Sequence, residues 1–140
     1  MSQSQSQSQH HRIAEIEALD PVAREKLAAA GLKTVEELLE RAAGAAHRAS
    51  LAKELGVPVS DVTEWVNRAD LMRINGVGRE FSDLLENAGV DSCKELQHRV
   101  AENLHAKIKE VNAAGAFTKQ TPGLTQLQNW IDQAKTIAAG

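Results

Sequence analysis

The sequence predicts an all-α fold built from two related helical units. Apolar residues recur at three- and four-residue spacing over most of the chain, which places them on one face of a helix. Residues that favour helix starts, and glycines that favour helix ends, stand between these apolar stretches. No segment alternates apolar and polar residues between hairpin turns, as a strand would. We therefore expect the helices of both units to share one compact helical core.

Start and stop signals divide the chain into helices. Asp20 is a good N-cap and Pro21 suits a first helical turn, so the first helix is expected to end before Gly31. Capping boxes, in which a hydroxyl and a carboxylate exchange hydrogen bonds with backbone amides, begin at Thr34 and Ser92. The predicted helices span residues 21–30, 35–43, 46–55, 60–74, 79–88, 93–100, 102–113 and 125–138.

The second half of the chain repeats the first. A shift of 58 positions superposes Leu27 on Leu85, and a shift of 65 superposes Trp65 on Trp130. The second copy therefore holds a seven-residue insertion, 65 less 58, which we expect within residues 112–123 because glycine and proline gather there. Both tryptophans lie on apolar faces and are expected to anchor the core.

This duplication divides the chain into three parts. Residues 1–11 form a polar Ser-Gln repeat ending in two histidines, for which we expect a disordered tail. Residues 12–67 form the first repeat and residues 68–140 the second, since internal duplication indicates two similar structural units. The predicted helix 60–74 crosses the boundary and should couple the repeats rigidly.

A Gly-x-Gly turn in the second repeat is the main functional signal. Glycine permits a positive φ and leaves room for an anion beside the main chain. The amides after the turn begin a helix, where donors lack intrahelical partners and the helix dipole is positive. Two arginines flank the turn and would add charge-assisted contacts to a phosphate. The candidate nucleic-acid-binding residues are Gly76, Val77, Gly78, Arg79 and Arg73.

The surroundings of this turn resemble the helix-hairpin-helix motif of DNA repair and replication proteins. The matching residues are Leu71, Ile74, Gly76, Val77, Gly78, Phe81, Leu84 and Leu85, followed by Ala88-Gly89-Val90. The tandem arrangement, with its segments Ala-Ala-Gly-Leu-Lys-Thr-Val-Glu-Glu-Leu-Leu and Glu-Trp-Val-Asn-Arg-Ala-Asp-Leu-Met-Arg-Ile, resembles an uncharacterised bacterial family, domain of unknown function 4332. The resemblance covers nearly everything after the tail. It implies tandem helix-hairpin-helix repeats and no settled activity.

Two interpretations of function stay open at this stage. The chain either binds the DNA backbone without reading base sequence, as phosphate contacts do, or serves as a protein–protein interaction adaptor in which the hairpins are purely structural. The first repeat favours a structural hairpin, because Ala18 and Asp20 stand where the second has Gly76 and Gly78. A single competent hairpin should bind DNA with a dissociation constant on the order of 1 to 100 µM.

Composition argues against several other classes. With 16 Lys and Arg against 19 Asp and Glu, the net charge of -3 is unlike that of a protein that coats nucleic acid. The single cysteine, Cys93, allows neither an internal disulfide nor a cysteine zinc site, and we expect it to be a small buried hydrophobe. No nucleophile turn is present. We expect no catalytic residues, no metal and no cofactor.

The sequence also bears on the cellular location of the protein and on its partners. No apolar run approaches the roughly 20 residues that span a bilayer, and the N-terminus lacks the features of a secretory signal. We therefore expect a cytoplasmic protein without a membrane partner, whose partner is either DNA, bound weakly, or another protein. The sequence does not set the oligomeric state.

Overall fold

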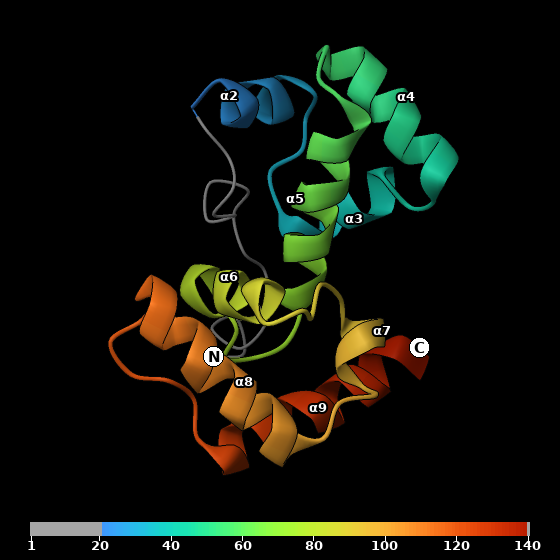
Figure 1. The fold of residues 1–140 in the computed structure, drawn as a ribbon. Coiled ribbons are helices and arrows are strands. Elements are labelled where there is room, and N and C mark those ends of the chain that lie inside the picture. Colours follow the sequence, from blue (N-terminus) through green and yellow to red (C-terminus); the bar gives the residue numbers. More distant parts are fainter. Residues whose placement is uncertain (1–20, 140) are drawn as a thin grey trace, which may run out of the picture.

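Helices joined by short connections make up the protein in our computed structural model, which describes residues 21–139 (Figure 1). In chain order they are α2 (Pro21–Ala29), α3 (Val35–Arg41), α4 (Ala45–Leu55), α5 (Val59–Leu71), α6 (Arg79–Asn87), α7 (Cys93–Leu96), α8 (Ala101–Gly115) and α9 (Leu124–Ala139). Residues 21–139 contain no strand, so the predicted all-α class is confirmed. The expectations for the tail and for Ala18 and Asp20 lie outside the described residues.

The capping box predicted at Thr34 is complete, whereas its counterpart in the second repeat is half formed. The Thr34 hydroxyl accepts a hydrogen bond from the Glu37 amide at 3.1 Å, and the Glu37 carboxylate accepts one from the Thr34 amide. Ser92 likewise accepts from the Glu95 amide at 3.1 Å. The Glu95 carboxylate, however, accepts from Arg99 at 2.8 Å. The arginine one turn later holds the carboxylate that would otherwise complete the box.

Two helices end three or more residues earlier than their apolar pattern predicts. The helix expected over residues 60–74 ends at Leu71, and the one expected over 93–100 ends at Leu96. In both cases the amides two and three residues past the helix end donate to carbonyls three residues back, such as the 3.1 Å bond from the Ile74 amide to the Leu71 carbonyl. These tighter turns continue the helical pattern of apolar residues while ending the α-helix.

The loop expected within residues 112–123 lies inside that range. α8 continues to Gly115 and α9 begins at Leu124, so the loop covers residues 116–123. The Asn112 side chain explains the shape of this loop: it accepts from the Thr118 amide and donates to the Thr118 carbonyl, each at 3.0 Å. One helical side chain thus satisfies both backbone groups of a loop residue.

Buried residues form two clusters, which corrects the expectation of one shared core. α2 to α5 enclose the first cluster and α6 to α9 most of the second, as the two halves in Figure 1 show. Leu71 belongs to the second cluster and Met72 to the first, because successive residues at a helix end point in different directions. Trp65 and Trp130 are buried, one in each cluster, which confirms that they are core anchors.

None of the helices described within residues 21–139 has both the length and the apolar character needed to cross a bilayer.

Removing the complete capping box should weaken the first half. We expect Thr34→Ala to lower the free energy of unfolding by about 1 kcal/mol, because the Glu37 amide loses its acceptor. Thr136→Ala is the matched control: Thr136 is exposed within α9, and a change of less than about 0.5 kcal/mol is expected. Urea denaturation measures both. Equal effects of the two variants would contradict the assignment of Thr34 as a stabilising cap.

Candidate functional site

The turn between α5 and α6 places glycine at two positions with different constraints. Gly76 has φ +102°, in the left-handed region, and the Val77 amide closes the turn by donating to the Ile74 carbonyl at 3.0 Å. The Val77 side chain is buried in the second cluster. Gly78 is the N-cap of α6 and provides no side-chain cap. The helix therefore begins without a capping side chain at its N-cap.

Packing against Trp130 explains Gly76 but not Gly78. A Cβ added at Gly76 would lie 3.0 Å from Nε1 of Trp130, closer than a side chain normally packs. A Cβ added at Gly78 would meet nothing within 4 Å. Gly76 is thus required by the fold, whereas the space beside Gly78 is open to a ligand.

A glutamine on the last helix holds the turn in place. The Gln133 side chain accepts a hydrogen bond from the Asn75 amide at 2.9 Å and donates one to the Asn75 carbonyl at 3.2 Å. Its amide nitrogen also donates to Asn129 at 2.8 Å, which orients it along α9. Sequence analysis did not find Gln133, because nothing in its local pattern indicates a partner so distant along the chain.

A surface hollow of about 560 Å³ lies beside the turn. Its lining residues are Gly76, Gly78, Arg79, Glu80 and Phe81. Phe81 packs on Trp130 with ring centroids 5.2 Å apart, so the second cluster supports one wall. The structure therefore brings together Gly76, Gly78 and Arg79, and it adds Phe81 and the opposing charge of Glu80. Val77 does not line the hollow, since its side chain is buried and its amide donates to the Ile74 carbonyl.

Arg73 is not among the residues that line the hollow. Its guanidinium pairs with the Asp70 carboxylate at 3.0 Å. The other oxygen of Asp70 accepts from the Cys93 amide at 2.7 Å, at the start of α7. Asp70 thus connects the end of α5 to the next helix and neutralises Arg73.

Cys93 is buried, as predicted for a small hydrophobe. Burial, together with the charge of Asp70, raises the pKa of its thiol to about 12. Its Sγ donates to the Asp70 carbonyl at 3.2 Å. The thiol therefore stays protonated and unreactive near neutral pH.

Positive charge near the hollow is lower than the sequence indicates. Arg68 lies on α5, five residues before Arg73. It is buried and pairs with carboxylates of α5 and α6. Among the basic residues that the structure describes, Arg79 is the one that lines the hollow. Within residues 21–139, no three His, Cys, Asp or Glu side chains gather as they would around a metal ion.

These observations define an all-α protein of two helical halves, with a glycine turn at the point where the halves meet. The family model described as "Domain of unknown function (DUF4332)" matches residues 17–137, and the chain therefore belongs to this family. The match confirms the resemblance inferred from the sequence. Neither a curated protein nor a solved structure matches the chain.

The two glycines should respond differently to the same substitution. We expect Gly76→Ala to lower the free energy of unfolding by about 1 to 3 kcal/mol, because alanine is strained at φ +102° and its methyl meets the Trp130 indole. Gly78→Ala should cost less than about 1 kcal/mol, since its Cβ meets open space. Urea unfolding followed by tryptophan fluorescence gives both values. A Gly78→Ala cost as large as that of Gly76→Ala would contradict this distinction.

Proposed function

We propose that this chain is a non-enzymatic protein that binds the phosphate backbone of DNA at the hollow beside the turn, without reading base sequence. The observation that carries the proposal is the start of α6: its N-cap, Gly78, supplies no capping side chain and faces open space. The first turn of a helix offers amides to outside partners, and its dipole favours an anion. A phosphate is an anion of suitable size and geometry for such a site.

The charges around the hollow indicate weak binding. Arg79 lies at its edge and favours a phosphate, whereas Glu80 lines the same hollow and opposes one. Arg73 is paired with Asp70 and therefore contributes less than its position in the sequence suggests. A dissociation constant on the order of 1 to 100 µM at low salt is expected, and it should rise steeply with salt concentration.

Gly78→Asp tests the proposal without disturbing the fold. Aspartate is a favourable N-cap, so it should preserve or stabilise α6 while placing a carboxylate where the phosphate would bind. The matched control is Gly123→Asp, which makes the same charge change immediately before α9, where a Cβ also meets open space. Fluorescence anisotropy with labelled duplex and single-stranded DNA at low salt measures the affinities.

Wild type and Gly123→Asp should bind DNA with affinities within about threefold of each other, since Gly123 does not line the hollow and one surface charge outside it changes binding little under salt screening. Gly78→Asp should weaken binding about tenfold or more, because it blocks the contact itself. Absence of salt-sensitive binding by the wild type would contradict the proposal, as would unchanged affinity of a folded Gly78→Asp variant.

A second candidate is a protein–protein adaptor with structural hairpins. The observation that favours it is the pairing of Arg68 and Arg73 with the chain's own carboxylates, which leaves less positive charge for DNA. A pull-down from nuclease-treated lysate tests this candidate. The adaptor candidate predicts that a protein partner stays bound after nuclease treatment. It also predicts that the Gly78→Asp variant binds the same partner. Recovery of nucleic-acid-bound proteins alone would contradict it.

A further inference from the structure

A buried arginine joins the two halves of the molecule. Arg68 on α5 is only 7% exposed. Its Nε lies 3.0 Å from Glu64 of the same helix, and its Nη2 lies 2.8 Å from Asp83 and 3.0 Å from Glu86 on α6. We call Arg68, Glu64, Asp83 and Glu86 the Arg68 cluster. Because Nη1 is buried without a hydrogen-bond partner among the described residues, contacts at Nε and Nη2 compensate the charge of the guanidinium.

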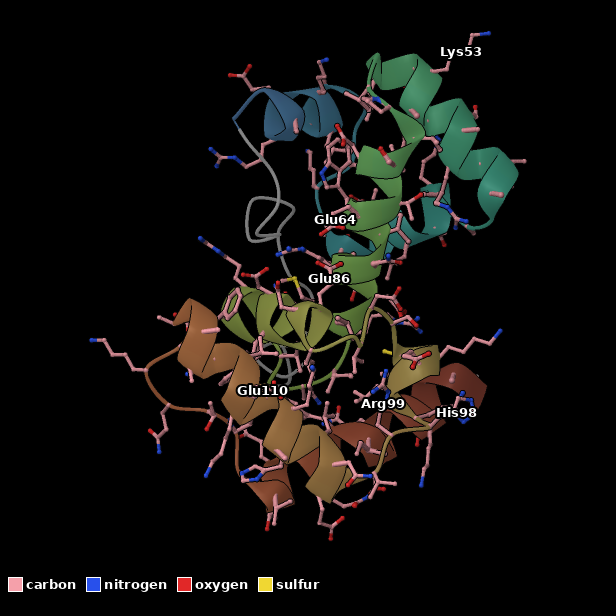
Figure 2. The ribbon with its side chains drawn as sticks, viewed as in Figure 1. Lys53, Glu64, Glu86, His98, Arg99 and Glu110 are labelled. Atoms are coloured by element: carbon pink, nitrogen blue, oxygen red, sulfur yellow. The ribbon has the colours of Figure 1, made fainter. Side chains whose placement is uncertain are left out.

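The Arg68 cluster lies where the two hydrophobic clusters meet. α5 contributes Val62, Trp65 and Ala69 to the first, and α6 contributes Leu84 and Leu85 to the second. In Figure 2 the labelled side chains of Glu64 and Glu86 lie next to each other between α5 and α6. The ion pairs therefore connect the part of α5 that packs into the first cluster to α6, which packs into the second.

The cluster holds more negative than positive charge. Three carboxylates face one guanidinium, and Asp91, in the loop after α6, lines the same surface hollow of about 480 Å³ as Glu64, Arg68 and Glu86. This hollow gives solvent access to the cluster. With every group ionised, two carboxylates would face each other in a partly desolvated site, which is unfavourable.

A proton shared by Glu64 and Glu86 would relieve this repulsion. Burial, with a hydrogen bond to Glu64, raises the pKa of Glu86 to about 8. The same hydrogen bond lowers the pKa of Glu64, which therefore remains the ionised acceptor. Although burial opposes it, the carboxylates of Glu86, Glu64 and Asp83 raise the pKa of Arg68, so the guanidinium stays charged. Near neutral pH, Glu86 carries the proton.

We propose that the Arg68 cluster is a pH-sensitive junction, in which a proton shared by Glu64 and Glu86 holds α6 against α5 and loss of that proton weakens the contact between the two halves. Among residues 21–139, the charged groups that face Glu86 are Glu64 and Arg68 from α5, Asp83 from α6 and Asp91 from the following loop. This regulation is independent of DNA binding, since it concerns the other end of α6 from Gly78.

The sign of the pH dependence follows from the direction of the shift. The pKa of Glu86 is higher in the folded chain than its ordinary value of 4.5, so the folded state binds more protons over the interval between them. The contribution of Glu86 to stability is complete below pH 4.5. It is lost as the pH rises through the folded pKa of about 8. Since one pKa unit corresponds to a factor of ten, the unfolding constant should rise about tenfold between pH 7 and pH 9.

Glu86→Gln tests the junction because glutamine resembles the protonated carboxyl at every pH. The matched control is Glu110→Gln on α8, whose side chain is 75% exposed (Figure 2). Urea unfolding at pH 7 and pH 9 should show the tenfold increase in the unfolding constant for wild type and Glu110→Gln, and a much smaller one for Glu86→Gln. Cys93, whose pKa burial raises from 9 to about 12, contributes equally to all three proteins and mainly above pH 9.

A second measurement needs no variant and applies even if Glu86→Gln does not fold. NMR titration of the glutamate side-chain carbons in the wild-type protein should show Glu86 titrating well above pH 6. Titration of Glu86 near its ordinary value would overturn the proposal. A folded Glu86→Gln variant with the full pH dependence of the wild type would also overturn it.

Discussion

One helix serves two hydrophobic cores, and the rest of the structure depends on that constraint. α5 packs Trp65 into the first cluster and ends with Leu71 in the second. The charged contact from Arg68 to α6 lies between those two positions. Burying a guanidinium is costly unless carboxylates compensate it, and Glu64 of α5 and Asp83 of α6 do so here, while Glu86 of α6 also contacts Arg68. The orientation of the second half thereby follows from α5.

The packing of α6 against α5 determines the geometry of the turn between them. Because α6 returns over the second core, the turn passes against Trp130, and that contact requires glycine at position 76. Gln133 then fixes the backbone of Asn75 from the last helix. What remains unconstrained by packing is Gly78, at the open start of α6. The candidate phosphate site is therefore the part of the turn that the fold does not itself need.

Local chemistry could be predicted from the sequence, whereas contacts between distant segments could not. Thr34 revealed its capping box because a hydroxyl and a carboxylate three residues apart are sufficient for one. The pattern around Gly76 likewise predicted the turn and three residues that line the hollow, Gly76, Gly78 and Arg79. It also named Arg73 and Val77, which do not line it. In the sequence, by contrast, Arg68 is an ordinary basic residue of a helix near the turn. Its pairing with the acidic side chains of α6 is visible only in the structure. The division into two cores was also missed, since apolar spacing shows that a residue is buried and not which neighbours surround it.

We expect α5 to couple the two cores into one cooperative unit. The two tryptophans allow a direct test, because Trp130→Phe leaves Trp65 to report on the first cluster and Trp65→Phe leaves Trp130 to report on the second. In urea unfolding at pH 7, helical circular dichroism should give the same transition as fluorescence in each variant, as expected when no intermediate is populated. If the circular dichroism of either variant showed two transitions, with the fluorescence change confined to one of them, the halves would unfold independently and the account would be contradicted.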